Sequence, residues 1–392
     1  ISDVNFRGMD LTQVSLSGFC LNHCYVDEQN PHSQKNERKF AGAVIGDRTI
    51  SGEGHTMDVT AVSWSCSEKS VFMSASHDCT IRIWDINDKS SNVLPRKHAN
   101  YIRCAEWSPA DADKMASAGD NQELICWERE KNSRKWNSRI LARLDDWIYG
   151  LSWSPDGRRI ACGERSGRVS VIDLQGRRAN FSQKHKEYVR RISWAPGSRG
   201  IFASGSDEGT VCLWNADPEK VEKQPLVRLE LYGKRVTGLA WLEDGRYLMV
   251  SDTDCYMIME TSKLLSCGGQ QTISLLNKED LLLKKEKRKN ISAIAVRRKR
   301  DKDFVAVFYA ESVDIFYTTC IREGNFEFIS VDTTEWNEEI VSSSQWNAEC
   351  DRLICGCDNG EICYIDVKAG EVSKDRIDTN KIVDGCGCSV RC

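Results

Sequence analysis

The stretch "GHTMDVTAVSWSCSEKSVFMSASHDCTIRIWD", residues 54–85, decides the fold of this chain. It runs 29 positions from a histidine to a tryptophan, and two later stretches align with it over the same length without a gap. The aligned pairs are His55 and Trp84, His98 and Trp127, and His185 and Trp214. Short segments of alternating apolar and polar residues, such as "VTAVSWS", "VFMSASHD" and "TIRIWDI", predict three strands in each copy.

A tryptophan nine positions after the histidine marks the first predicted strand of each strong copy, and this position identifies four weaker copies. The seven aligned residues are Trp64, Trp107, Trp153, Trp194, Trp241, Val296 and Trp346, at spacings of 41 to 55 residues. One weak copy has Ile172 in place of the final tryptophan. A small unit of this kind cannot bury its faces alone, so the seven units must pack on one another.

With Gly54-His55 near its start and Trp84-Asp85 at its end, the first copy resembles the WD-repeat family, whose motif separates GH and WD by about thirty residues. The resemblance covers residues 40–370 and implies an all-β, seven-bladed β-propeller with four-stranded antiparallel blades. The family closes its ring with an N-terminal strand, so "FAGAVIGDRTI" (40–50) is the candidate outer strand of the last blade. The segment "EVSKDRID" (371–378) competes for the same edge.

The resemblance also implies a structural role for the histidines. In the family, a loop histidine, a serine or threonine, a turn aspartate and the final tryptophan form a buried hydrogen-bonded tetrad. The second copy has Asn121 and the fourth has Glu208 at the aspartate position, so those networks are altered. The tetrad residues of the three strong copies are His55, Ser74, Asp78, Trp84, His98, Ser117, Trp127, His185, Ser204 and Trp214.

No catalytic or metal-binding set remains once the tetrads are assigned. The tryptophan spacing accounts for the Ser, His and Asp residues, and no nucleophile-elbow sequence accompanies them. The pairs Cys355/Cys357 and Cys386/Cys388 fit alternating strand positions better than a zinc site, which usually has CxxC spacing. We therefore expect no enzymatic activity, no cofactor and no metal.

The predicted binding site surrounds the central opening, where propellers of the family mostly bind proteins or peptides. Residues on either side of the first apolar residue of each first strand should point into the channel mouth. In blades two to five, these positions and one neighbouring turn supply Tyr101, Arg103, Trp147, Tyr149, Arg165, Tyr188, Arg190 and Arg235. Trp, Tyr and Arg dominate binding hot spots, and the arginines suit an acidic or phosphorylated peptide. The alternative is that some of these rings only plug the channel.

Two basic runs, "KKEKRK" (284–289) and "RRKRDK" (297–302), lie at opposite ends of one predicted strand in the sixth unit. They match a nuclear-localisation signal or an RNA-phosphate patch, but solvated loops are the favoured interpretation. The formal net charge is only -4, so nucleic acid is not an expected partner. A run of about eighteen apolar residues, the length of a membrane span, does not occur, so we expect no membrane association and a cytoplasmic location.

The N-terminal segment has an apolar residue at every fifth position, a period that fits neither a strand nor a helix. These residues are Phe6, Leu11, Leu16, Leu21 and Val26. The pattern resembles pentapeptide repeats, although Met9 and Phe19 depart from them, and a chance pattern or an irregular strand pair is the alternative. Residues 1–39 are therefore predicted to be a pentapeptide-repeat-like lead-in, and residues 371–392 a tail or the start of a further repeat.

Pentapeptide-like coils followed by this propeller resemble the C-terminal sensor regions of NACHT-type signal-transduction NTPases, and the start at Ile1 suggests a piece of a longer chain. No GxxxxGK[ST] motif occurs, so the nucleotide-binding module is not in these residues. The first hypothesis is a non-catalytic recognition or scaffold domain, which could be the sensor of a larger signalling protein. The second is a constitutive subunit of a cytoskeletal, ciliary or ribonucleoprotein assembly, and neither hypothesis predicts an oligomeric state.

Overall fold

The computed structural model describes residues 44–45, 48–49, 54–87, 90–131, 133–181, 185–198, 200–216, 224–231, 234–267, 272–274, 282–287, 290–309, 312–318, 327–332, 341–358, 360–368 and 371–376. The predicted pentapeptide-like lead-in (1–39) lies outside the described residues, and so does the chain after residue 376. The predictions for both segments therefore stay predictions.

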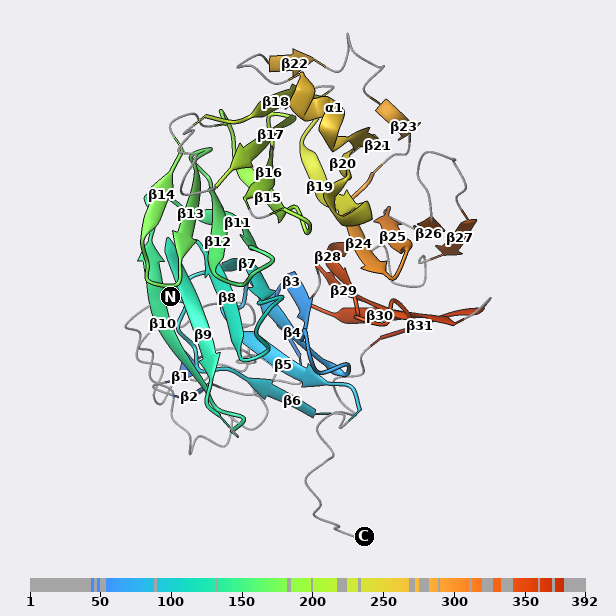
Figure 1. The fold of residues 1–392 in the computed structure, drawn as a ribbon. Helices are drawn as coiled ribbons and strands as arrows, with labels where there is room; N and C mark the ends of the chain where they lie inside the picture. The colour runs from blue at the N-terminus through green and yellow to red at the C-terminus, as the bar shows by residue number, and fades with distance from the viewer. Residues whose placement is uncertain are drawn as a thin grey trace, which may run out of the picture.

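The described residues form seven antiparallel sheets of at least four strands, arranged as the blades of a propeller (Figure 1). Blade one contains β3 (Val59–Trp64), β4 (Val71–Ser76), β5 (Ile81–Asp85) and β6 (Ser90–Val93). Blade two contains β7 (Ile102–Trp107), β8 (Lys114–Gly119), β9 (Glu123–Arg129) and β10 (Trp136–Arg143). Blade three contains β11 (Ile148–Trp153), β12 (Arg159–Glu164), β13 (Val169–Asp173) and β14 (Arg178–Asn180).

The remaining blades follow the same order from the centre outward. Blade four contains β15 (Val189–Trp194), β16 (Ile201–Ser206), β17 (Thr210–Asn215) and β18 (Val227–Glu230). Blade five contains β19 (Val236–Leu242), β20 (Tyr247–Asp252), β21 (Cys255–Glu260) and β23 (Leu282–Lys287). Blade six contains β24 (Ala293–Lys299), β25 (Lys302–Phe308), β26 (Ser312–Thr318) and β27 (Glu327–Asp332). Blade seven contains β28 (Val341–Trp346), β29 (Arg352–Cys357), β30 (Ile362–Lys368) and β31 (Glu371–Arg376).

The ring is closed by contact between the first strands of neighbouring blades. Each first strand contacts the next, and β28 of the last blade contacts β3 of the first, so segments about 280 residues apart in sequence lie side by side (Figure 1). The predicted seven-bladed, all-β propeller is therefore confirmed. In the described part of the chain, no helix is long and apolar enough to cross a membrane.

Of the two candidate segments for the closing edge, 371–378 and not 40–50 supplies the strand at the outer edge of blade seven. β1 (Val44–Ile45) and β2 (Arg48–Thr49) pair with each other, and the outer edge of blade seven is formed by β31. β31 begins at Glu371, three positions after the last residue of β30, Lys368, so the two strands can pair antiparallel without closing a long loop.

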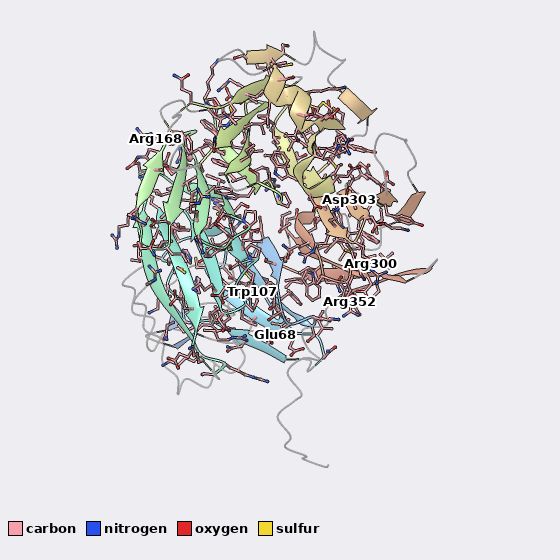
Figure 2. All side chains as sticks on the ribbon, in the orientation of Figure 1. Glu68, Trp107, Arg168, Arg300, Asp303 and Arg352 are labelled. Carbon is pink, nitrogen blue, oxygen red and sulfur yellow. The ribbon has the colours of Figure 1, made fainter. Side chains whose placement is uncertain are left out.

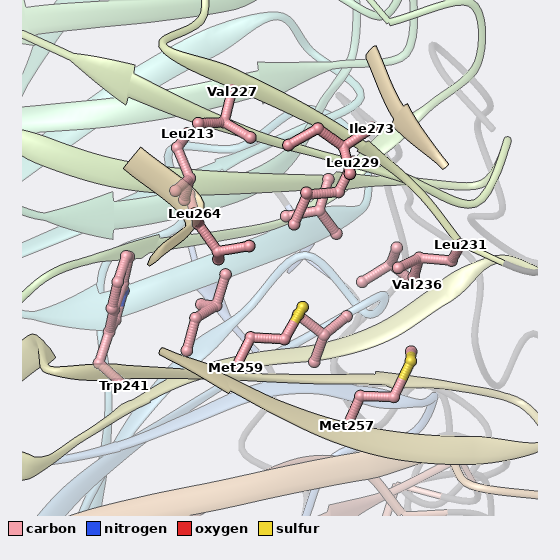
Figure 3. Close-up of a cluster of buried hydrophobic side chains, with 14 of the residues drawn as sticks. Leu213, Val227, Leu229, Leu231, Val236, Trp241, Met257, Met259, Leu264 and Ile273 are labelled. Atoms are coloured by element: carbon pink, nitrogen blue, oxygen red, sulfur yellow. The ribbon is translucent and has the colours of Figure 1, made fainter. Parts of the chain in front are cut away.

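A second difference from the predicted pattern lies between blades four and five. After β21 the chain forms a short helix, α1 (Thr261–Ser266), and then β22 (Thr272–Ser274), which pairs in parallel with β18 of the preceding blade. The chain then returns as β23 to the edge of blade five. Leu264 of α1 and Ile273 of β22 are buried with Val227, Leu229 and other residues of both blades, so this excursion covers the joint between them (Figure 3).

The core lies between neighbouring blades rather than inside one layer; Figure 2 shows the side chains on the ribbon. The first apolar residue of each inner strand is at most 4% exposed, from Val59 in blade one to Val341 in blade seven. Apolar clusters combine neighbouring blades, for example Trp107 with strands of blades one and two. Burying one such side chain stabilises the fold by about 1.5–3 kcal/mol, so interlocking of neighbours explains why a single blade would not be stable alone.

The first-strand tryptophans also join neighbouring blades through hydrogen bonds. The Trp153 Nε1–H donates to the Glu106 carbonyl oxygen of blade two at 3.1 Å, and the Trp241 Nε1–H donates to the Ser193 carbonyl at 3.1 Å. Trp64 and Trp194 make the same bond to the preceding blade. Trp107 instead donates to the Ala112 carbonyl of its own blade at 2.8 Å, so the inter-blade bond is made by four of these tryptophans.

Candidate interaction surface

The three histidine tetrads are hydrogen-bonded in the structure. In blade one, the His55 Nδ1–H donates to Asp78 Oδ2 at 2.8 Å, and the Ser74 hydroxyl lies 2.7 Å from His55 Nε2. The Trp84 Nε1–H donates to the same Ser74 oxygen at 2.7 Å. His98, Ser117 and Trp127 repeat this arrangement in blade two, as do His185, Ser204 and Trp214 in blade four.

The acceptor at His Nδ1 differs among the tetrads. In blade two, the Asn121 side-chain oxygen lies 3.1 Å from His98 Nδ1, and burial lowers the pKa of His98 to about 4. In blade four, Glu208 Oε1 lies 3.2 Å from His185 Nδ1, and burial lowers the pKa of His185. The rings are therefore neutral near pH 7. They bridge a loop to two strands rather than face a cavity, so they are placed to support structure and not acid–base chemistry.

A β-bulge positions the predicted binding residues. In six blades the pairing of the first two strands shifts just after the first apolar residue, as between Val189 and Arg191 in blade four. The bulged residue is Arg103 in blade two, Tyr149 in blade three and Arg190 in blade four. A bulge turns one side chain away from the hydrogen-bonded strand pair. These three residues therefore point toward the channel mouth. The end of the propeller where the first strands begin is called the top face below.

On the top face, aromatic rings and guanidinium groups alternate in one continuous ladder across blades two, three and four. Tyr149 and Tyr188 are stacked with their ring centroids 5.3 Å apart. The Arg103 guanidinium lies 5.0 Å from the Tyr149 centroid, and that of Arg190 lies 4.8 Å from it. The further contacts join Arg103 to Tyr101 at 5.3 Å, Arg190 to Tyr188 at 5.3 Å, and Arg165 to Tyr188 at 5.8 Å and to Trp147 at 4.5 Å.

Two of the four predicted anion-binding arginines already have carboxylate partners. Arg103 donates from Nε and Nη2 to the two oxygens of Asp120, each at 2.8 Å. Arg190 Nε lies 2.8 Å from both oxygens of Asp207. Both aspartates come from the turns between second and third strands. These pairs fix the ladder in place, and they leave little positive charge on Arg103 and Arg190 for an acidic ligand.

A cavity of about 230 Å³ opens at the channel mouth beside the ladder. It is lined by Asp58, Thr60, His77, Arg103, Tyr149, Arg190, Arg191, Arg235, Val236, Thr237, Ser292, Val341 and Ser342. The structure thus brings Arg103, Tyr149, Arg190 and Arg235 to one cavity, while Tyr101, Trp147, Arg165 and Tyr188 continue the surface outward through the ladder.

Arg191 is the cavity residue that the sequence reasoning missed. Strict alternation along β15 assigns only Tyr188 and Arg190 to the mouth, but the bulge adds a residue and brings Arg191 to the cavity as well. The Arg191 Nε–H donates to the Thr237 carbonyl oxygen of blade five at 2.6 Å. Two consecutive arginines at the start of a first strand were the available sequence signal.

Comparison with known proteins agrees with this architecture. The model of the family described as "WD domain, G-beta repeat" matches residues 46–85, 139–173 and 178–215, which lie in blades one to four. THO complex subunit 3 of Arabidopsis thaliana is 25% identical over 207 residues, covering 52% of this chain and 62% of that protein.

Two further relatives are similarly distant. Methylosome protein WDR77 of Xenopus laevis is 25% identical over 172 residues, covering 43% of this chain and 50% of that protein. Protein transport protein SEC31 of Chaetomium globosum is 24% identical over 193 residues, covering 47% of this chain and 15% of that protein. The chain therefore covers less than two thirds of each of these relatives. The described residues form a seven-bladed β-propeller, and three segments of the chain match the WD40 repeat model.

Proposed function

We propose that this propeller is a non-catalytic interaction domain whose top face, on blades two to five, binds a protein or peptide partner. The observation that supports this proposal most is the ladder of stacked rings and guanidiniums beside an open cavity. Its aromatic and arginine side chains are held in place before any partner arrives, so little side-chain entropy is lost on binding. The channel mouth also remains open beside the rings, which favours a ligand site over a plug.

The proposal extends to the biological setting. The domain acts as a scaffold or as the sensor of a larger signalling protein of NACHT type, located in the cytoplasm and away from membranes. Upstream coding sequence that contains a P-loop nucleotide-binding module, together with imaging of the tagged full-length protein, tests this part separately from the binding surface.

A constitutive subunit of a larger assembly is the second candidate. The printed names of two relatives, THO complex subunit 3 and a methylosome protein, place those proteins in assemblies. The second basic run (297–302), at the loop between β24 and β25, has part of its positive charge paired within the chain. Arg298 pairs with Asp244 and with Asp303, each at 3.1 Å, and Lys299 pairs with Glu349 at 3.0 Å (Asp303 is labelled in Figure 2). These pairs favour the top face over the basic loop as the contact surface.

Quantitative affinity enrichment from cells with the Trp147→Ala variant tests the proposal. Trp147 lies at the outer end of the ladder, so its removal shortens the recognition surface while the blade core stays intact. Ile140→Ala is the matched control because Ile140 is an apolar residue, 46% exposed, on the outer strand of blade two. We expect the same discrete partners with the wild type and Ile140→Ala, and their loss with Trp147→Ala. Equal recovery with all three folded proteins would exclude the top face.

A further inference from the structure

The cavity at the channel mouth is lined by more arginines than the carboxylates that pair with them. Four guanidiniums line it, and two of them, Arg103 and Arg190, are neutralised by Asp120 and Asp207. Within the described part of the chain, neither Arg191 nor Arg235 has a carboxylate partner. Asp58 is the acidic residue that lines the cavity, and its carboxylate lies 3.3 Å from His77 Nδ1 in blade one.

Arg191 is partly buried beside two other arginines. Burial, followed by the neighbouring charges of Arg190 and Arg235, lowers the pKa of Arg191 to about 10. The side chain stays protonated at neutral pH, and one guanidinium nitrogen is fixed by the Thr237 carbonyl. Arg235 is exposed at the start of the same blade as Thr237. Two positive charges therefore face one cavity, and among the described residues neither is paired with a carboxylate.

A serine hydroxyl on the blade-six side completes the cavity. Thr60 and Ser342, at the matching positions of other blades, donate their hydroxyl hydrogens to backbone carbonyls, Thr60 to Ile102 O at 2.8 Å and Ser342 to Gly356 O at 3.1 Å. The Ser292 Oγ is buried and, among the described residues, has no hydrogen-bond partner. A buried hydroxyl without a partner is unfavourable unless a ligand supplies the missing bond.

We propose that Arg191, Arg235 and Ser292 form a binding site for a phosphate monoester, carried by a phosphorylated residue of the partner. This inference rests on the proposed function and locates its anion site. It moves the site away from Arg103 and Arg190, whose charges are neutralised, to the opening between blades four, five and six.

The charge count favours a phosphate over a carboxylate. A phosphate monoester carries a charge of about -1.5 to -2 at pH 7, which matches two uncompensated guanidiniums, and its oxygens also accept from a hydroxyl. A carboxylate would compensate only one of the two arginines. Single-stranded nucleic acid is a poorer match because it binds by stacking bases on open ring faces. Tyr149 and Tyr188 each lie between two guanidiniums of the protein's own chain.

Binding of N-acetyl-O-phosphoserine amide to the purified chain, measured by ³¹P NMR line broadening at fixed ionic strength, tests this site. We expect binding by the wild type and at least a ten-fold loss with Arg191→Gln and with Arg235→Gln. Arg158→Gln is the matched control because Arg158 is an exposed arginine after the first strand of blade three, at the opposite end of the blade. It removes the same charge and should bind as the wild type does.

Competing ligands separate the possible sources of the anion. Inorganic phosphate should displace the phosphoserine amide, whereas N-acetyl-aspartate amide should displace it at least ten-fold less well. Displacement by an oligonucleotide as effective as that by phosphate would overturn the proposal in favour of nucleic acid. The proposal is also overturned if the wild type does not broaden the ³¹P signal, or if the folded Arg191→Gln and Arg235→Gln variants bind as well as the wild type.

The same variants separate failure of this site from failure of the proposed function. If Trp147→Ala loses its partner while Arg235→Gln and phosphatase treatment leave capture unchanged, the interaction surface is correct and the phosphate site is wrong. If partner capture survives Trp147→Ala as well, the proposed function itself is wrong.

Discussion

Replacing Glu106 by glutamine should stabilise the protein, and more strongly at higher pH. Glu106 lies in β7 between blades two and three, where its Oε2 accepts a hydrogen bond from the Trp153 backbone N–H at 2.8 Å. Burial, only partly offset by this bond and by one from Ser152, raises the pKa of Glu106 to about 7. Blade seven has Gln345 at the matching position, and its Oε1 accepts from the Trp64 N–H at 2.5 Å. Glutamine therefore already fills this role in the same chain.

The size of the effect follows from the raised pKa. Because folded Glu106 holds its proton more tightly than the unfolded chain, its contribution to stability is present below the unfolded pKa and is lost as pH rises toward 7. The change from 4.5 to about 7 corresponds to a loss of about 2–3 kcal/mol between pH 5 and pH 8, since one pKa unit equals about 1.4 kcal/mol. Glu106→Gln removes this loss and keeps an oxygen acceptor for Trp153.

Denaturant unfolding followed by tryptophan fluorescence at pH 5 and pH 8 measures the effect. We expect the stability gain of Glu106→Gln over the wild type to be about 2 kcal/mol larger at pH 8 than at pH 5. Glu187→Gln, on an exposed glutamate, should give the same difference from the wild type at both pH values. A gain from Glu106→Gln that does not depend on pH, or a loss at pH 8, would refute the reasoning.

Three further changes test the packing of the blades. Ser204→Ala removes the acceptor of Trp214 in the blade-four tetrad and should lower the free energy of unfolding by about 2 kcal/mol, with Ser→Ala at an exposed position as control. The wild type should lose stability between pH 7 and pH 5, because the low pKa of folded His98 disfavours protonation that the unfolded chain accepts. His98→Gln should reduce this loss in the free energy of unfolding by about 2 kcal/mol. The same loss in the wild type and the variant would contradict this. Gly163→Ala should lower the free energy of unfolding by about 1–3 kcal/mol, since the new Cβ would lie 2.5 Å from Val189 Cγ1 of the next blade. A thermal unfolding midpoint equal to that of the wild type would show that the two blades separate easily.

The repeat could be predicted from sequence because each polar or bulky residue in it has a fixed structural task. The histidine and serine satisfy each other and the final tryptophan, and the first-strand tryptophan joins one blade to the next. Such residues recur at fixed spacing, so even blade six, which has Val296 at the tryptophan position, could be placed in the series. The outer strands have no comparable residue, which is why the sequence left both 40–50 and 371–378 as candidates for the closing edge.

The details of the site depend on features that the simple alternation of side chains along a strand does not predict. A bulge in β15 brings Arg191 into the cavity beside Arg190, although strict alternation would separate them. The pairing of Arg103 with Asp120 and of Arg190 with Asp207 connects a strand to a turn 17 residues later, and it changes which arginines can receive an anion. The sequence predicted the residues of the surface, whereas their charge balance required the structure.

Site-specific photo-crosslinking in cells tests most directly whether the top face is the interaction surface. A photoreactive amino acid in place of Arg165 reports on contacts at the exposed end of the ladder, and the same group in place of Arg158 reports on the opposite end of blade three. We expect discrete protein adducts from position 165 and none from position 158. Adducts from position 158 alone would contradict this expectation and place the interaction surface at the other end of the propeller.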